Sequence, residues 1–293
     1  MLTNTFVDLL NFKHKSCIFN NSIEEEIPYK YINLYVKIAD KCNARCKFCE
    51  YHDKDVNFIF YFDKFTHIIK TLEHEDIHIH KVSFTGGEPT LNLYDLRKCL
   101  EFLKSLKFPP FTVVNSNGLS LKPLIDDENL DNISLSRHTV SDKEQFELSG
   151  TKSIPRAIEL MAYGGVAKIH LTCNLIKGYV DSSEKIIEYL EFAASLGIYD
   201  VGFVSLMQIN KFCEQYHIDF DDIIFKDQRI VCNKEWSYKD VCKCKNFLYL
   251  PEKGNKVIKF YSRYRCKNEV ESRSNYIFDG KYLRSNFGGS ILY

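Results

Sequence analysis

The sequence predicts an α/β protein built on a partial (β/α)6 TIM barrel, followed by a C-terminal α+β extension that contains cysteines. Between residues 31 and 207, six β-branched or aromatic segments recur, and each except the last precedes a segment with helical spacing of apolar residues. The repeat is roughly 30 residues long, the size of one β/α unit, and such alternation predicts parallel strands covered by helices. A complete barrel takes about 250 residues, so six units favour an open one. A doubly wound sheet remains the alternative, because the pattern alone does not separate the two.

The elements follow from local periodicity. Residues 31–39 (YINLYVKIA) are β-branched and aromatic, which favours a strand. Residues 62–74 place Phe65, Ile68 and Leu72 on one helical face, and 93–106 carry leucines at a spacing of three or four. The predicted strands are 31–39, 81–85, 111–115, 132–136, 167–176 and 201–206, and the predicted helices are 62–74, 93–106, 119–126, 154–163 and 183–196.

The C-terminal part has a different pattern. Residues 247–250 and 257–264 flank a polar turn and predict a β-hairpin. A smaller hairpin is predicted at 276–278 and 281–283, around Asp279-Gly280. We therefore divide the chain into a lead-in (1–30), a barrel (31–207) and an extension (208–293).

Composition limits the possible functions. The 293 residues include 39 basic and 39 acidic side chains, and 45% are apolar, so a sizeable core can form. Zero net charge argues against a general nucleic-acid binder. No apolar run of about 18 residues is present, and the N-terminus lacks the features of a secretory signal. These observations predict a cytoplasmic protein with no membrane segment.

Charge is unevenly distributed along the chain. Residues 229–293 hold 14 Lys and Arg against 6 Asp and Glu, whereas residues 1–228 hold 25 against 33. The extension is therefore basic and the body acidic. These charges either pair with each other, or the extension offers cations to an anionic substrate at the open barrel. The candidates for that second role are Lys256, Lys259, Arg263 and Arg265.

Three cysteines follow the first predicted strand. Cys42, Cys46 and Cys49 stand at i, i+4 and i+7, a spacing for which chance predicts only roughly 0.02 occurrences in a chain of this cysteine content. The C-terminal edge of such strands is where β/α folds build their sites. Together with His52 the thiols would make a closed zinc site. Without it they would hold an iron–sulfur cluster with one iron left open, since clusters normally take four protein ligands.

The segment CNARCKFC at 42–49 resembles the CX3CXΦC motif of the radical S-adenosylmethionine (SAM) superfamily, with Phe48 at the aromatic position. The resemblance implies a [4Fe–4S] cluster whose open iron is chelated by SAM. It also implies reductive cleavage of SAM to methionine and a 5′-deoxyadenosyl radical, which abstracts hydrogen from a substrate. The cofactor does this chemistry, and the protein positions it.

A second motif favours the cluster over zinc. The second predicted strand ends in Gly86, Gly87, Glu88 and Pro89, which resembles the GGEP motif of the same superfamily. Glycines permit a close approach of backbone to a ligand. The resemblance implies that the backbone carbonyls and Glu88 accept hydrogen bonds from the amino group of SAM.

Further residues resemble SAM-contacting positions of the superfamily. Asn117, after the third strand, would contact the ribose, and Ser134 on the fourth strand would reach the carboxylate. Arg137 replaces part of the usual pattern there and is a second candidate for that carboxylate. Thr172 and Asn174 share one face of the fifth strand. His138, beside this strand end, is with Arg137 a candidate catalytic residue that touches substrate.

Four more cysteines lie in the extension, at Cys232, Cys242, Cys244 and Cys266. Their spacing matches neither the two-cluster maturase pattern nor the cyclase pattern of the superfamily. They could hold a second iron–sulfur cluster, a structural zinc ion, or no metal at all. We predict that they converge in space.

Two branches of the superfamily compete for the function. One is a small-molecule or nucleotide-modifying enzyme resembling the GTP 3′,8-cyclases, which we favour; the other is a maturase of a ribosomally made peptide. A zinc-stabilised binding module is the non-enzymatic alternative. An enzyme of this class implies an electron donor such as flavodoxin or ferredoxin and a small-molecule or peptide substrate.

Overall fold

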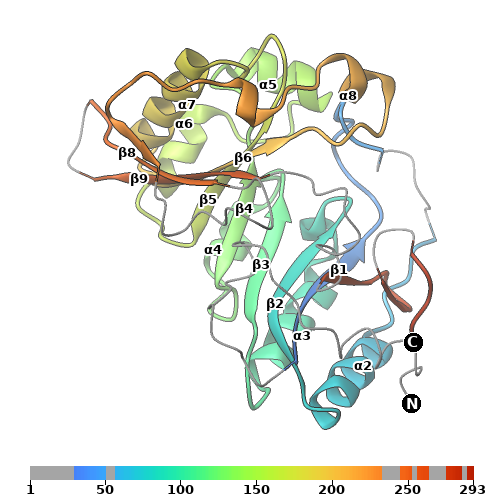
Figure 1. Cartoon of the computed structure of the whole chain (residues 1–293). Coiled ribbons are helices and arrows are strands. Elements are labelled where there is room, and N and C mark those ends of the chain that lie inside the picture. The colour runs from blue at the N-terminus through green and yellow to red at the C-terminus, as the bar shows by residue number, and fades with distance from the viewer. Residues whose placement is uncertain (1–29, 51–56, 233–244, 253–255, 264–274, 286–288) are drawn as a thin grey trace.

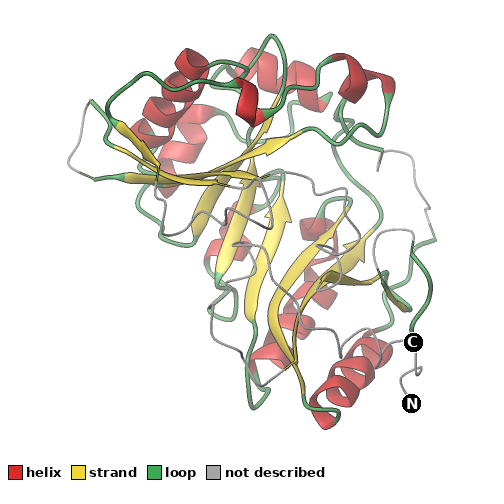
Figure 2. Ribbon diagram, viewed as in Figure 1, coloured by secondary structure: helices red, strands yellow, loops and turns green. Residues whose placement is uncertain are grey.

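The computed structural model describes residues 30–50, 57–232, 245–252, 256–263, 275–285 and 289–293. One eleven-stranded sheet runs through these residues in the order β11-β10-β1-β2-β3-β4-β5-β6-β9-β8-β7. Helices cover one face of this curved, open sheet (Figures 1 and 2). The chain is therefore an α/β protein in which a single sheet organises both the predicted barrel and the extension.

Strands β1 to β6 are parallel and adjacent in chain order. A doubly wound sheet would reverse direction at a switch point, so this order selects the partial barrel. The sheet does not close on itself, as predicted from the number of units. The six strands are Lys30–Ala39 (β1), Ile77–Gly86 (β2), Phe111–Ser116 (β3), Asn132–Ser136 (β4), Ile169–Leu175 (β5) and Asp200–Ser205 (β6).

The predicted helices are present with small shifts at their ends. They are Phe62–His74 (α2), Leu93–Lys104 (α3), Leu121–Ile125 (α4), Ala157–Leu160 (α6), which continues as the 3₁₀ turn Met161–Tyr163 (η3), and Ser183–Ser195 (α7). Elements that the sequence did not predict are Asp142–Ser149 (α5), Lys211–Gln215 (α8) and the 3₁₀ turns Pro89–Asn92 (η2) and Phe220–Asp222 (η4). Among the described helices, none has the length and apolar character needed to cross a membrane.

The two faces of the sheet differ in chemistry. Along β5, Ile169, Leu171 and Cys173 are buried against the helices. The alternating residues His170, Thr172 and Asn174 are only partly buried and face the other way. Because strand side chains alternate, the helix-covered outer face forms the hydrophobic core and the inner face of the open barrel is polar.

The extension adds strands to both edges of the barrel. Its strands are Ile230–Cys232 (β7), Lys245–Tyr249 (β8), Ile258–Arg263 (β9), Asn275–Phe278 (β10) and Leu283–Arg284 (β11). Both predicted hairpins form, as antiparallel β8–β9 and β10–β11. In addition, β9 lies parallel to β6 and β10 parallel to β1. Each otherwise open edge of the six-stranded core is thereby paired.

A polar cluster ties the β7–β9 side of the extension to helix α7. The carboxylate of Glu191 accepts hydrogen bonds from the Tyr249 hydroxyl at 2.5 Å and from the Glu252 backbone N–H at 2.8 Å. Arg229 lies 3.4 Å from the same oxygen. A second ion pair joins Lys245 to Asp221 at 3.0 Å. Part of the basic charge of the extension is thus paired with acidic residues of the body.

This cluster predicts the effect of removing its carboxylate. Glu191→Ala should lower the free energy of unfolding by about 1–3 kcal/mol, because it leaves the Tyr249 hydroxyl without an acceptor. Urea denaturation measures the change. The control is Glu188→Ala on the same helix, which removes an exposed pair with Lys185 and should change stability by less than about 0.5 kcal/mol. Equal effects of the two variants would contradict the linking role of Glu191.

Candidate functional site

The cysteine loop, residues 40–50, follows β1 and lies at the C-terminal ends of the strands. It contains no helix or strand, and several of its backbone groups form hydrogen bonds with neighbouring segments. The N–H groups of Arg45 and Lys47 donate to the carbonyls of Ser149 and Leu148 at the end of α5. Figure 1 shows this blue segment running from β1 toward α8, where the Asn210 side chain donates to the Lys47 carbonyl at 3.2 Å.

The three thiols of this loop lie close enough to influence one another. Burial raises the pKa of Cys46 to about 12, and the neighbouring Cys49 and Cys42 raise it further. Burial also raises the pKa of Cys42, whose sulfur accepts an N–H from Ala44 at 3.4 Å. Thiols held together in this way need a positive group to become thiolates, and metal ions provide one.

The two metal alternatives for these thiols differ in what they need. Zinc takes its thiolates around one centre, at about 2.3 Å each, whereas a cluster distributes them over separate irons. Within the described residues, no group of three His, Cys, Asp or Glu side chains that could hold one metal ion is found. His52, the fourth ligand of the zinc alternative, lies outside the described residues.

The glycines of the GGEP motif pack against the cysteine loop. A Cβ on Gly86 would lie 2.0 Å from the Ala39 carbonyl oxygen, and one on Gly87 would lie 2.0 Å from that of Lys41. The Gly87 N–H donates to the Ala39 carbonyl at 2.9 Å. Gly86 also has a φ of +126°, which favours glycine. The close approach that these glycines permit in this structure is therefore to the backbone that carries the cysteines.

Glu88 is buried at the centre of the strand ends. Its Oε1 atom accepts hydrogen bonds from Thr90 N, Thr90 Oγ1 and Ser116 Oγ, and its Oε2 atom accepts one from Asn117 N at 2.8 Å. Pro89 starts the η2 turn that brings Thr90 into place. Burial nevertheless raises the pKa of Glu88, and no Lys or Arg among the described residues pairs with it. A carboxylate has about four acceptor sites, so Oε2 retains capacity for an ammonium.

Asn117 faces the cysteine loop. Its amide nitrogen donates to Asn43 Oδ1 at 2.7 Å and lies 3.7 Å from Cys42 Sγ. Its own Oδ1 accepts the Leu119 N–H. Hydrogen bonds to cluster thiolates tune reduction potential. The structure thus places this residue beside a predicted cluster ligand, while the predicted contact with the ribose stays a prediction.

The inner face of β4 and β5 brings together four of the predicted residues. Ser134 Oγ and Thr172 Oγ1 are 2.8 Å apart. His138 Nδ1 accepts the Asn174 backbone N–H at 3.0 Å, and its ring contacts Phe48 edge-on at a centroid distance of 4.6 Å. Burial and the adjacent Arg137 lower the pKa of His138 to about 3. This imidazole is neutral near pH 7, with its proton on Nε2.

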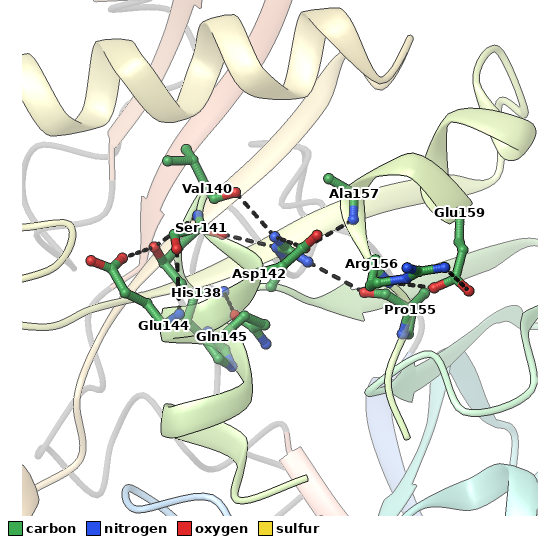
Figure 3. A network of polar contacts seen from close by, with 12 residues as sticks. His138, Val140, Ser141, Asp142, Glu144, Gln145, Pro155, Arg156, Ala157 and Glu159 are labelled. Carbon is green, nitrogen blue, oxygen red and sulfur yellow. Dashed lines mark hydrogen bonds and ion pairs between the residues drawn. The ribbon is translucent and has the colours of Figure 1, made fainter. Parts of the chain in front are cut away.

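Arg137 has a structural role, and its predicted contact with the SAM carboxylate and its predicted part in catalysis stay predictions. Its side chain is 2% exposed. The guanidinium donates to the carbonyls of Thr139, Val140 and Pro155 and forms a 2.7 Å ion pair with Asp142. Figure 3 labels Val140, Asp142 and Pro155 in this network of polar contacts. Four of the five donor sites of the guanidinium are thus used within the protein.

Two helices that the sequence did not predict support the cysteine loop. Helix α5 begins at Ser141, whose hydroxyl accepts the Glu144 N–H, and ends at Gly150, where a Cβ would lie 2.9 Å from the Arg45 carbonyl oxygen. The Ser-x-x-Glu spacing and the terminal glycine are sequence signals for such a helix. In α8, the Cys213 thiol lies 3.6 Å from the Phe48 carbonyl oxygen, a contact that no local sequence signal indicates.

The extension cysteines lie largely outside the described residues. Cys242, Cys244 and Cys266 fall there, as does Arg265. Cys232 ends the short strand β7 and is exposed. The convergence of these four cysteines therefore stays a prediction.

Comparison with known proteins identifies the class of enzyme. The family model described as the radical SAM superfamily matches residues 36–205, more than half of the chain. The chain therefore belongs to the radical SAM superfamily and is an enzyme of that class, which uses a [4Fe–4S] cluster and SAM. This membership rules against the zinc-stabilised binding module.

Sequence relatives and one solved structure show which members of the superfamily the chain resembles. The chain is 24% identical over 242 residues to the GTP 3′,8-cyclase of Aquifex aeolicus, covering 76% of this chain and 72% of that protein. It is 24% identical over 221 residues to the GTP 3′,8-cyclase of Limosilactobacillus fermentum, covering 67% and 66%. Among solved structures, Streptococcus suis SuiB bound to S-adenosylmethionine matches with a TM-score of 0.51 and 21% identity, over 62% of this chain and 42% of that one. The last match supports the fold alone.

The structural role of Arg137 can be tested directly. Arg137→Leu should lower the free energy of unfolding by about 3–5 kcal/mol, because it leaves Asp142 unpaired beside three carbonyls without donors. Chemical denaturation measures this. The control Arg156→Leu removes an exposed pair with Glu159 and should cost less than about 1 kcal/mol. An Arg137 variant of normal stability that no longer binds SAM would contradict the structural role and support the SAM contact predicted from the sequence.

Proposed function

We propose that this radical SAM enzyme abstracts a hydrogen atom from a small molecule or nucleotide bound at the inner face of its open barrel. The observation that carries the proposal is the docking of the cysteine loop on the strand ends, beside buried Glu88 and above a polar inner face. This arrangement supports the proposal that SAM is held at the C-terminal edge of the sheet.

The residues at this edge fit the cofactors. Cys42, Cys46 and Cys49 would ligate three irons of the cluster. Glu88, a buried carboxylate without a cationic partner among the described residues, would accept the ammonium of SAM through a charge-assisted bond. When bound, the cluster supplies the electron that splits SAM into methionine and the 5′-deoxyadenosyl radical. The protein orients SAM and keeps water from the radical.

The substrate class is supported by two features. Relatives that match about two thirds or more of this chain include GTP 3′,8-cyclases, which favours a nucleotide or another small molecule over the alternative of a ribosomally made peptide. The extension is basic, which favours an anionic substrate. Strand β9 runs parallel to β6, so its last residue, Arg263, lies at the edge of the sheet that carries the cysteine loop. An electron donor such as flavodoxin or ferredoxin would reduce the cluster.

The cluster assignment is tested by single cysteine substitutions. Replacing Cys42, Cys46 or Cys49 by Ala should abolish SAM cleavage and remove most of the iron bound at this loop after anaerobic reconstitution. The reason is that each substitution leaves the cluster with only two of its three thiolate ligands. Iron analysis and 5′-deoxyadenosine formation are the measurements. Cys99→Ala, in the buried face of α3, is the matched control and should retain both. Wild-type protein that binds zinc but no iron would disprove the assignment.

The anionic substrate predicts a dependence on salt. Attraction between exposed charges is screened over about 10 Å at 0.1 M ionic strength, so the apparent affinity for GTP, used as the probe, should weaken as salt rises. Arg263→Glu should weaken it further. Affinity that ignores both salt and the reversed charge would show that the basic extension does not bind the substrate, while the cluster assignment would be unaffected.

A further inference from the structure

The peptide groups between Cys46 and Cys49 are held by hydrogen bonds within the loop and to helix α5. The Lys47 N–H donates to the Leu148 carbonyl at 2.9 Å. The Cys49 N–H donates to the Cys46 carbonyl at 3.0 Å and closes a tight turn between these two predicted cluster ligands. The backbone that carries both thiols therefore has a defined conformation.

Helix α8 binds the carbonyls of the same segment. Asn210 precedes this helix as its N-cap, and its Oδ1 atom accepts the Cys213 N–H at 2.9 Å. The Nδ2 atom of the same side chain donates to the Lys47 carbonyl at 3.2 Å. The Cys213 thiol lies 3.6 Å from the Phe48 carbonyl oxygen. One amide side chain thus joins the start of α8 to the cysteine loop.

The Phe48 N–H is the polar group of this segment that these contacts leave over. No group in the described part of the chain accepts a hydrogen bond from it. Peptide groups are planar and trans, and the described residues contain no cis peptide bond. The Phe48 N–H therefore points opposite to the Lys47 carbonyl of the same peptide group. Because Asn210 binds that carbonyl from α8, the N–H is directed away from α8.

The surroundings of Phe48 differ between its ring and its N–H. The ring packs against an apolar cluster that includes Leu148 of α5 and Cys213 of α8. The N–H, by contrast, stands two residues after Cys46 and directly before Cys49. Backbone N–H groups that are shielded from water need an acceptor, and a cluster held by these two thiols would offer anionic sulfurs.

Hydrogen bonds to its sulfurs raise the reduction potential of a cluster, because they stabilise the more negative reduced state. We propose that Asn210 is a positioning residue that directs the Phe48 N–H toward the sulfurs of the cluster and thereby raises its reduction potential. The inference rests on the proposed function, because it assumes a cluster at this loop. It gives the segment after β6 a part in electron uptake, which neither the cysteine motif nor the GGEP motif indicates.

Isotope labelling of the wild type tests the contact without any substitution. Phe48 is the only phenylalanine among residues 40–50, so protein grown with ¹⁵N-phenylalanine carries the label in the cysteine loop at that position only. After anaerobic reconstitution and reduction, pulsed electron paramagnetic resonance should detect a ¹⁵N nucleus coupled to the cluster. The coupling should weaken in Asn210→Ser. A reduced wild-type cluster without this coupling would overturn the proposal.

The same variant tests the effect on the potential. Asn210→Ser keeps a neutral oxygen that can cap α8, since Ser and Asn are comparable N-caps. It removes the amide donor and leaves a side chain too short to reach the Lys47 carbonyl. The equilibrium constant for one-electron reduction should fall by roughly threefold to tenfold, and a tenfold fall corresponds to about 59 mV. A redox titration without SAM, followed by electron paramagnetic resonance, measures the shift.

Controls separate this effect from loss of a helix cap and from failure of the proposed function. Ser182→Ala removes the cap of α7, whose hydroxyl accepts the Lys185 N–H. It should lower the melting temperature and leave the potential unchanged. Asn210→Ser with full iron content and the wild-type potential would overturn the positioning role. If that variant takes up no iron, the coupling in labelled wild type decides. Wild type that forms no cluster would overturn the proposed function instead.

Discussion

The docking of an irregular loop onto rigid backbone determines the rest of this structure. Residues that ligate a cluster must sit in a fixed arrangement, yet a loop without helix or strand cannot satisfy its own backbone polar groups. The chain solves this with partners on two sides: carbonyls at the end of α5 and the Gly86-Gly87 backbone. The need to bind the backbone of this loop accounts for glycine at positions 86 and 87 and for the place where α5 ends.

The apolar residues that stabilise the fold and the polar residues lie on opposite faces of the sheet. Its outer face contacts the helices through apolar residues such as Leu171 and Val201, which are fully buried. Its inner face carries Ser134, Thr172 and His170, whose polar atoms bond across the strands. Substitutions on the outer face are therefore expected to act on folding, whereas the inner face is where the proposed ligands would bind. Arg137 is an exception, because this charged residue at a strand end is buried and holds the fold.

Local pattern predicted the strands, most helices and the cysteine loop, because alternation, helical spacing and motif spacing are all short-range. It did not predict the role of Arg137, since the acceptors at Thr139, Val140 and Pro155 are brought together only by the folded loop. Helix α5 was missed although Ser141, Glu144 and Gly150 signal it, because its low apolar content gives no strong periodicity. The pairing of extension strands with β1 and β6 depends on the whole topology, which no segment encodes.

The position of β10 has a consequence for how the chain folds. Asn33 on β1 pairs with Asn275 on β10, so β1 gains this neighbour only after the chain has been synthesised as far as β10. Contacts of such long sequence separation slow folding. Until then no other described strand pairs with this edge of β1, and unpaired edges are prone to pairing with other chains. A product that ends before β10 would thus lack the strand that covers this edge, even though every residue of the cysteine loop is present.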